Sequence, residues 1–261
     1  MAWQPAQYLQ FAGERLRPAV DLLARIPLEH PRTIVDLGCG AGNVTRLLGE
    51  RWPEAQILCV DSSPEMLDEA CAVTANDPRY RFVTADLAYW QPDATVDLLY
   101  SNAALHWLPD HAALFPRLAN MVAQGGALAV QMPDNFRAPS HMTIADIARS
   151  ERWRAKLGPI VREPPVAAAA DYLAWLAPLT TRVDVWLTEY LQVLPPRVDG
   201  EHPVAAWTKG TWLVPFMAAL EECERAEFLR EYMQRLALSY PARPDDSVLF
   251  PFRRLFIVAN R

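Results

Sequence analysis

A cluster of three glycines near the amino terminus has the spacing of a ligand-binding turn. The segment VDLGCGAGN, residues 35–43, places glycines at positions 38, 40 and 42, directly after an apolar run. Glycine is required where the backbone adopts positive φ or approaches a ligand closely, and a helix N-terminus behind the turn offers free N–H donors. The spacing differs from the nicotinamide fingerprint G-x-G-x-x-G, because Asn43 stands where a small residue is needed. The Gly-Lys-Ser/Thr of a phosphate-binding loop is also missing.

Acidic side chains stand beside this turn and at the ends of later apolar runs. Asp36 lies two residues before the first glycine, Asp61 follows QILCV, and Asp86 follows YRFVT after one alanine. In open α/β sheets, ligands bind outside the carboxyl ends of the strands. The sequence therefore predicts a binding edge here, although each acid taken alone could equally be a solvated loop end or a helix cap.

The elements that must position these residues are strands alternating with helices. Five apolar runs are predicted as strands, at residues 33–37, 56–60, 80–84, 96–100 and 127–132. Helices are predicted over 14–25, from Asn43 as a cap to Pro53, after Ser63-Pro64, and over 112–122. Because each crossover returns the chain to the same edge direction, this alternation predicts a doubly wound, mostly parallel α/β sheet.

The chain after Pro133 is irregular and then returns to long strands. We predict a helical stretch over 141–157, strands over 182–194 and 248–260, and one long helix over 216–240. No linker separates two cores, so the prediction is a single domain over residues 1–261 with a helical insertion after the fifth strand.

The run D-L-G-C-G-A-G-N resembles motif I of class I S-adenosylmethionine-dependent methyltransferases, whose Rossmann-like sheet has seven strands. The resemblance implies that Asp36 orients a loop carrying the methionine end and the ribose of S-adenosylmethionine. It implies that Asp61 accepts hydrogen bonds from both ribose hydroxyls, since a carboxylate takes two donors side by side. The implied cofactor-binding residues are Asp36, Gly38, Cys39, Gly40, Gly42, Asp61, Ser62, Met66, Asp86, Leu87, Ser101 and Asn102.

Within this set, the resemblance implies that Met66 lies under the adenine and that Asp86-Leu87 reads its amine and the adjacent ring nitrogen. Ser101-Asn102 would pass beneath the sulfonium. The domain would then comprise an N-terminal lid or helix at 1–30 and a cofactor core at 31–135. The helical insertion spans 136–181, and residues 182–261 complete the sheet and the substrate pocket.

Segments spread over the whole chain resemble the branch of this family that esterifies trans-aconitate. They are YLQF near the amino terminus, SNAALHWLPDH, LAVQMPDN, WTKGT and FRRLFIVA. The implied activity is carboxyl O-methylation of a small polycarboxylic acid, giving a monomethyl ester and S-adenosylhomocysteine. A carboxylic acid with a pKa near 4 is already ionised at pH 7, so we expect alignment rather than a general base, and no catalytic residue is assigned.

An anionic substrate calls for basic side chains that hold carboxylates through bidentate hydrogen bonds. Because adjacent residues of a strand point oppositely, only one of Arg253 and Arg254 is expected to face the substrate. At His106 the family pattern has glutamine, so contact with substrate would alter acid specificity; a hydrogen-bonded loop histidine is the alternative. The full set of expected substrate-binding residues is Tyr8, Arg17, His106, Trp107, Arg137, Lys209, Arg253 and Arg254.

The composition and charge of the chain exclude several classes of protein. The chain has 25 basic and 31 acidic residues, a net charge of −6 and no basic stripe, so a nucleic-acid partner is not expected. No signal peptide, apolar span or metal-ligand cluster is evident, and the four cysteines are expected to be buried and reduced, as in a cytoplasmic protein without membrane or metal. Two alternatives stay open: a methyltransferase of another carboxylate, such as a carrier-protein-bound dicarboxylic acid, and a non-catalytic cofactor-binding protein. The sequence does not indicate an oligomeric partner.

Overall fold

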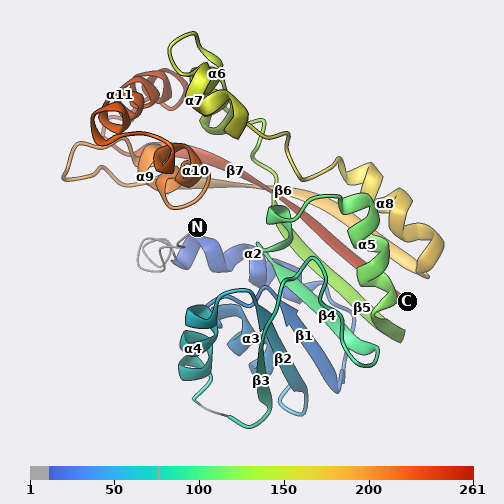
Figure 1. Ribbon diagram of the computed structural model, residues 1–261. Helices are drawn as coiled ribbons and strands as arrows, with labels where there is room; N and C mark the ends of the chain where they lie inside the picture. Colours follow the sequence, from blue (N-terminus) through green and yellow to red (C-terminus); the bar gives the residue numbers. More distant parts are fainter. Residues whose placement is uncertain (1–11, 76) are drawn as a thin grey trace. The chain divides into compact units, whose positions relative to one another are not determined.

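The computed structural model describes residues 12–75 and 77–261, with side chains from Leu16 onward (Figure 1). Tyr8 therefore lies outside the described residues. The described strands form one seven-stranded sheet in the order β3-β2-β1-β4-β5-β7-β6. The strands are β1 (Thr33–Leu37), β2 (Gln56–Asp61), β3 (Tyr80–Thr84), β4 (Val96–Asn102), β5 (Val122–Pro133), β6 (Arg182–Leu194) and β7 (Val248–Asn260).

Strand pairing confirms the predicted doubly wound, mostly parallel sheet. β1 pairs in parallel with β2 and β4, β2 pairs with β3, and β4 pairs with β5, whereas β7 runs antiparallel to β5. Helices follow the strands and also form the insertion between β5 and β6. They are α2 (Ala12–Ala24), α3 (Asn43–Arg51), α4 (Pro64–Val73), α5 (His111–Asn120), α6 (Pro139–Arg149), α7 (Arg154–Leu157), α8 (Ala169–Leu176), α9 (Pro203–Lys209), α10 (Val214–Ala218) and α11 (Glu222–Ser239).

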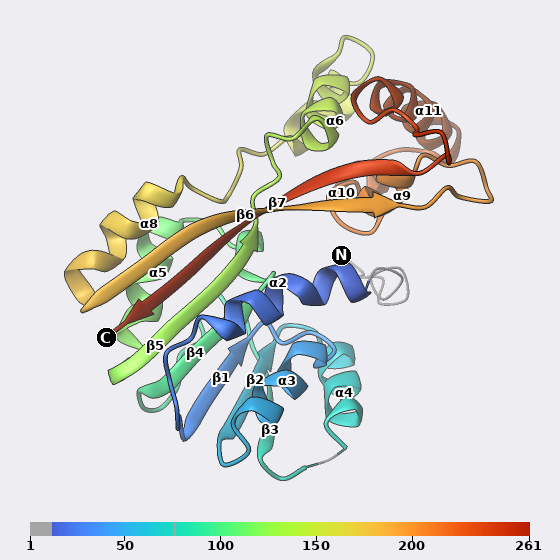
Figure 2. The same cartoon turned by 180° about the vertical axis from the view of Figure 1, so that it is seen from behind.

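One face of the sheet carries Asp36, Tyr100 and Ala129, which lie side by side on β1, β4 and β5; we call it the Asp36 face. The Tyr100 hydroxyl donates to the carbonyl of Ala19 on α2 at 3.5 Å, and Thr45 on α3 bonds Asp36, so α2 and α3 cover this face. Helices α5 and α8 lie against the opposite face, as the two views show (Figures 1 and 2).

The described chain divides into two compact units. The sheet unit comprises residues 13–133, 165–188 and 254–261; the helical unit comprises residues 134–164 and 189–253 together with Ala12. The helical unit has its own apolar core, in which the Phe250 ring lies 5.4 Å from Phe252 and 5.6 Å from Tyr240. Strands β6 and β7 run from one unit into the other.

Two predicted helices are each divided into two in the structure. The helix predicted over 216–240 is interrupted after α10, because Leu220 is buried and Glu224 accepts a hydrogen bond from the Glu221 backbone N–H, starting α11 anew. The stretch predicted over 141–157 is broken at Ser150, whose backbone is extended. A helical period alone does not reveal such breaks, because both segments keep their apolar faces.

A predicted helix cap and a predicted strand start were also wrong. Gly42, in the left-handed conformation, is the N-cap of α3, and Asn43 is its first helical residue, with no side-chain cap. The fifth strand, predicted over 127–132, begins earlier at Val122, so the Gly125-Gly126 pair lies inside it, where the pairing register with β4 shifts and Gly125 has a φ of 80°. Nor are all four cysteines buried: Cys223 on α11 is exposed and Cys71 is partly so.

Candidate active site

The glycine loop is shaped by three left-handed backbone conformations. Gly38, Gly40 and Gly42 have φ values of 81°, 54° and 78°. A Cβ on Gly38 would lie 2.2 Å from the Cβ of Ala104, and one on Gly42 would lie 2.9 Å from Ala70. A Cβ on Gly40 would meet no atom within 4 Å. The two outer glycines thus allow close packing of the loop, and the middle one faces open space that a ligand could enter.

Asp36 is the last residue but one of β1, before the loop, and is almost wholly buried. Its Oδ2 accepts a hydrogen bond of 2.6 Å from the Thr45 hydroxyl on α3. Burial raises the pKa of this carboxyl to about 7, against the lowering effect of the Thr45 bond, and the nearby Asp61 raises it slightly further. The side chain ties β1 to the first turn of α3, which supports the loop-orienting role predicted for it.

Asp61 ends β2 and holds the loop from its other side. Its Oδ2 accepts the Gly40 backbone N–H at 2.9 Å and its Oδ1 accepts the Ser63 N–H at 3.0 Å. Ser63 then caps α4 by accepting the Met66 N–H at 3.2 Å. Ser62 is exposed, whereas Met66 is buried in the first turn of α4. The carboxylate is therefore oriented by two backbone donors and keeps lone pairs for a ligand.

The loop after β3 is held by a residue that the sequence did not identify. Arg117, in the last turn of α5, donates to the carbonyls of Ala88 and Trp90 at 2.7 Å and to that of Leu87 at 3.3 Å. Asp86 stands exposed at the head of this loop and accepts the Ala88 N–H at 2.9 Å. A single arginine at a helix end carries no motif, so only the folded chain reveals that it fixes the expected adenine segment.

The segment after β4 is held by a hydrogen bond to β1 and then turns sharply. The buried Ser101 hydroxyl donates to the Leu37 carbonyl at 2.7 Å, and Ala103 has a left-handed φ of 55°. The Oδ1 of Asn102 is buried without a hydrogen-bond partner among the described residues. Such a group is a natural contact for a bound molecule, and it lies at the strand end where the cofactor's reacting part is expected.

A histidine outside the predicted site supports this same segment. The His111 Nε2 lies 3.0 Å from the Leu105 carbonyl, which only accepts, so Nε2 carries the proton. The unprotonated Nδ1 then accepts from the Tyr172 hydroxyl at 2.5 Å. Burial lowers the pKa of His111, so the neutral form is favoured. Beside it, His106 is buried and Trp107 is 39% exposed, their rings 4.7 Å apart.

The two adjacent arginines of β7 differ in their surroundings. Arg254 is only 5% exposed and lies on the sheet unit, in register with Pro133 of β5. Arg253 is exposed on the helical unit and forms a 2.9 Å ion pair with Asp134. Of the two, Arg254 is therefore the buried guanidinium. Arg17 on α2 is exposed.

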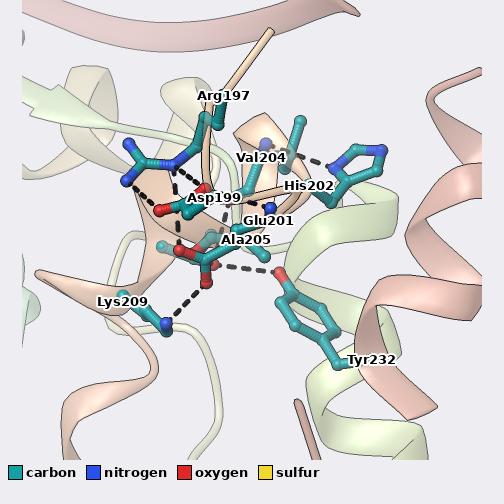
Figure 3. Close-up of polar contacts among 9 residues, drawn as sticks. Arg197, Asp199, Glu201, His202, Val204, Ala205, Lys209 and Tyr232 are labelled. Atoms are coloured by element: carbon teal, nitrogen blue, oxygen red, sulfur yellow. Dashed lines mark hydrogen bonds and ion pairs between the residues drawn. The ribbon is translucent and has the colours of Figure 1, made fainter. Parts of the chain in front are cut away.

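The other predicted basic residues lie in the helical unit. Arg137 and Arg253 line a cavity of about 640 Å³ with Asp134 and Tyr240. Lys209 is not among its lining residues; its Nζ pairs with Glu201 at 2.6 Å (Figure 3).

Glu201 belongs to a polar cluster that shapes the turn before α9. Arg197 donates to Asp199 at 2.7 Å and lies 3.9 Å from Glu201 on the side away from Lys209 (Figure 3). His202 accepts the Val204 N–H at 3.2 Å as the N-cap of α9. These contacts explain Lys209 as part of a structural ion-pair network in the helical unit.

The residues around the glycine loop fit S-adenosylmethionine in chemical type. Open space lies over Gly40, an oriented carboxylate stands at Asp61, and a buried acceptor without a partner stands at Asn102. Within residues 12–75 and 77–261, no three His, Cys, Asp or Glu side chains gather as metal ligands would. In the same part of the chain, no helix has the length and apolar character needed to cross a membrane.

Comparisons with known proteins agree with this geometry. A family model described as a methyltransferase domain matches residues 34–126. Trans-aconitate 2-methyltransferase of Methylobacterium nodulans is 47% identical over 260 residues, covering 99% of this chain and 98% of that one. The enzyme of the same name from an Azoarcus species is 45% identical over 259 residues, with 99% of each chain covered. The crystal structure of the YcgJ protein from Bacillus subtilis matches the fold with a TM-score of 0.61 at 12% identity, covering 94% of this chain and 98% of that one. The chain therefore belongs to the trans-aconitate 2-methyltransferase family of class I S-adenosylmethionine-dependent methyltransferases.

Proposed function

We propose that this protein transfers the methyl group of S-adenosylmethionine to a carboxylate of trans-aconitate, giving a monomethyl ester and S-adenosylhomocysteine. The observation that carries the proposal is identity of 43–47% over essentially the whole chain to relatives named for that activity. The glycine loop and the oriented Asp61 support it, because a chain that had lost cofactor binding would not need to retain them.

Methylation of a carboxylate requires no general acid or base from the protein. S-adenosylmethionine supplies a methyl group on a sulfonium, and the bond from that carbon to sulfur breaks as a carboxylate oxygen bonds to it. The attacking carboxylate is already ionised near neutral pH, so the chain must align it at about 3 Å and exclude water. No proton acceptor is needed, consistent with the lack of an assigned catalytic base.

On the cofactor side, we propose that Asp61 binds the ribose hydroxyls and that the Asp86–Leu87 loop, fixed by Arg117, binds the adenine. Met66 supplies an apolar surface from the first turn of α4. Asp36 keeps the loop in place through Thr45 rather than touching the cofactor. The remaining positions of motif I contribute backbone, and Cys39 is buried within it.

On the substrate side, we propose that Arg254 holds a carboxylate, because a guanidinium matches a carboxylate in charge and geometry and this one lies beside the carboxyl end of β5, in register with Pro133. Arg253 is screened by solvent and already paired with Asp134, so it contributes less. Contact of Arg17, His106, Trp107 and Arg137 with substrate stays a prediction. We also propose action in the cytoplasm on a small anionic acid, without nucleic-acid or membrane partners.

The test is incubation with methyl-labelled S-adenosylmethionine and a panel of mono-, di- and tricarboxylates, followed by mass detection of monomethyl esters. Ester formed from trans-aconitate in preference to the others is expected. A panel that includes carrier-protein-linked dicarboxylic acids tests the alternative substrate class. Cofactor binding without any ester from either class would leave a non-catalytic binding protein and overturn the proposal.

A matched pair of variants tests the role of Arg254. Arg254→Met is expected to raise the apparent KM for trans-aconitate by one to two decades, since losing one partner of a buried charge pair costs about 2–5 kcal/mol. A monocarboxylate analogue should suffer less, because it lacks the charge being held. Arg253→Met, one residue away on the exposed side, is the control. Equal KM values for both variants and the unmodified protein would remove Arg254 from the substrate site.

A further inference from the structure

Gln131, near the carboxyl end of β5, is a buried polar residue that the activity proposed above does not use. Its side chain is wholly buried, and neither Oε1 nor Nε2 has a hydrogen-bond partner among the residues that the structure describes. Its backbone carbonyl is occupied, accepting the Ala103 N–H at 2.9 Å. The large majority of buried side-chain polar atoms in folded proteins are paired, so an amide with both ends unpaired among the described residues favours a bound molecule as its partner.

The neighbours of Gln131 on the sheet suggest what that partner is. Gln131 lies in register with Asn102 of β4 on one side and Phe256 of β7 on the other, so these three side chains share the Asp36 face. The Oδ1 of Asn102 is likewise buried without a partner in the described chain. Two neighbouring strands therefore present unpaired amide groups at their carboxyl ends, the edge at which open α/β sheets bind ligands.

An aromatic wall and a cation complete the surroundings. Trp186 of β6 stacks on Phe256 at 4.9 Å with the rings nearly parallel. Arg254 precedes Phe256 by two residues on β7, which places it on the same face as Gln131, and it is buried. All of these residues belong to the sheet unit. Phe256 is wholly buried, and the Arg25 guanidinium lies 4.6 Å from the centre of the Trp186 ring, so these aromatic side chains support the site rather than offer it a free face. A molecule bound here would meet amide donors and one guanidinium, a set suited to a small polycarboxylate.

We propose that Gln131 is a specificity-determining residue that donates a hydrogen bond from its side-chain Nε2 to a carboxylate of the substrate, while Arg254 holds a second carboxylate. The inference rests on the proposed function. An uncharged donor fixes the position of a carboxylate without neutralising it, so the oxygen that attacks the methyl group keeps its negative charge. A guanidinium in the same place would withdraw that charge, and it is better used on a carboxylate that does not react.

The test compares Gln131→Met, which keeps the length and removes the amide, with Gln131→Glu, which keeps the shape and adds a negative charge. We expect Gln131→Met to raise the KM for trans-aconitate about 10- to 100-fold, since a hydrogen bond to a charged group is lost. Gln131→Glu should lose more, through repulsion of the substrate. The dissociation constant for S-adenosylhomocysteine, measured by calorimetry, should change less than about twofold. The control is Gln192→Met, a buried glutamine of β6 in the helical unit, for which unchanged kinetics are expected.

Thermal stability separates a substrate contact from a structural role. Removing an amide that has no partner in the described part of the chain should leave the Tm of Gln131→Met equal to or above that of the unmodified protein. A lower Tm, a failure to fold, or an equal loss of affinity for substrate and S-adenosylhomocysteine would show a structural residue and overturn the inference. Unchanged kinetics in Gln131→Met would overturn it while the proposed function stands. If the unmodified protein neither binds trans-aconitate in calorimetry nor methylates it, both proposals fall.

Discussion

The ionisation of Asp36 has a consequence for stability that can be measured. Burial raises the pKa of this carboxyl from its ordinary 3.8 to about 7. The folded state therefore binds the proton more tightly than the unfolded chain, and stability is lost as pH rises from about 4 to 7. Each tenfold difference in proton affinity is worth about 1.4 kcal/mol, so ionised Asp36 disfavours the fold by about 4 kcal/mol above pH 7.

The perturbation is Asp36→Asn, which keeps an oxygen able to accept from the Thr45 hydroxyl and removes the charge. Because only part of the penalty is present at pH 5, the stability of the variant relative to the unmodified protein should rise by about 2–3 kcal/mol between pH 5 and pH 8. The free energy of unfolding is read from urea titrations at both pH values, and taking the difference between proteins cancels the histidines that titrate in the same range.

The exposed Asp68 of α4 provides a reference for the same exchange at the surface, and Asp68→Asn is measured beside Asp36→Asn at both pH values. If the stability difference caused by Asp36→Asn is constant between pH 5 and pH 8, within about 0.5 kcal/mol, then the carboxyl is not held in a desolvated site and the reasoning is refuted. A variant less stable than the unmodified protein at pH 8 would show that the charged form itself is stabilising.

Three further outcomes are expected. Gly42→Ala should destabilise the fold by about 1–3 kcal/mol in urea unfolding, because its Cβ would lie 2.9 Å from Ala70 in a left-handed conformation. Gly40→Ala adds only the strain of its left-handed backbone and meets no atom, so it should destabilise less while weakening S-adenosylmethionine binding in calorimetry; the reverse order of destabilisation would contradict the loop geometry. Arg117→Gln should reduce cofactor affinity several-fold, because the loop expected to bind the adenine loses the donors that hold it, although Arg117 itself is not expected to contact the cofactor. Unchanged affinity would remove that role. Burial lowers the pKa of His111, so the unfolded chain binds the proton more tightly than the folded state, and stability falls below about pH 6.5. His111→Gln keeps a donor in place of Nε2 and should lessen this loss of stability in acid. Equal acid sensitivity in both proteins would count against this role.

The sequence could not predict that two helices are interrupted, and the reason is physical. At Leu220 the chain buries an apolar side chain and starts a new helix with a capping acid, while the apolar period continues through the break. Periodicity reports which face is apolar, not whether the backbone hydrogen bonds run without interruption. Residues 216–240 therefore looked like one helix, and only tertiary packing divides them.

The sequence alone determined the elements whose signals are local. Glycines at 38, 40 and 42 adopt left-handed conformations, the five apolar runs form strands, and the acid two residues before the turn lies next to the end of β1. These depend on backbone sterics and side-chain period, which neighbouring residues decide. The family, the parallel sheet and the cofactor-binding edge followed from them.

Contacts between residues distant in sequence were decided by the tertiary structure alone. Arg117 reaches the loop after β3 from 27–30 residues away, and Gln131 meets Asn102 only because β4 and β5 pair in one register. The alternation along β7 predicted that one of two arginines turns inward, but the burial of Arg254 depends on what packs over it. Burial, register and long-range partners are properties of the assembled sheet, and they determine which polar groups remain available for substrate.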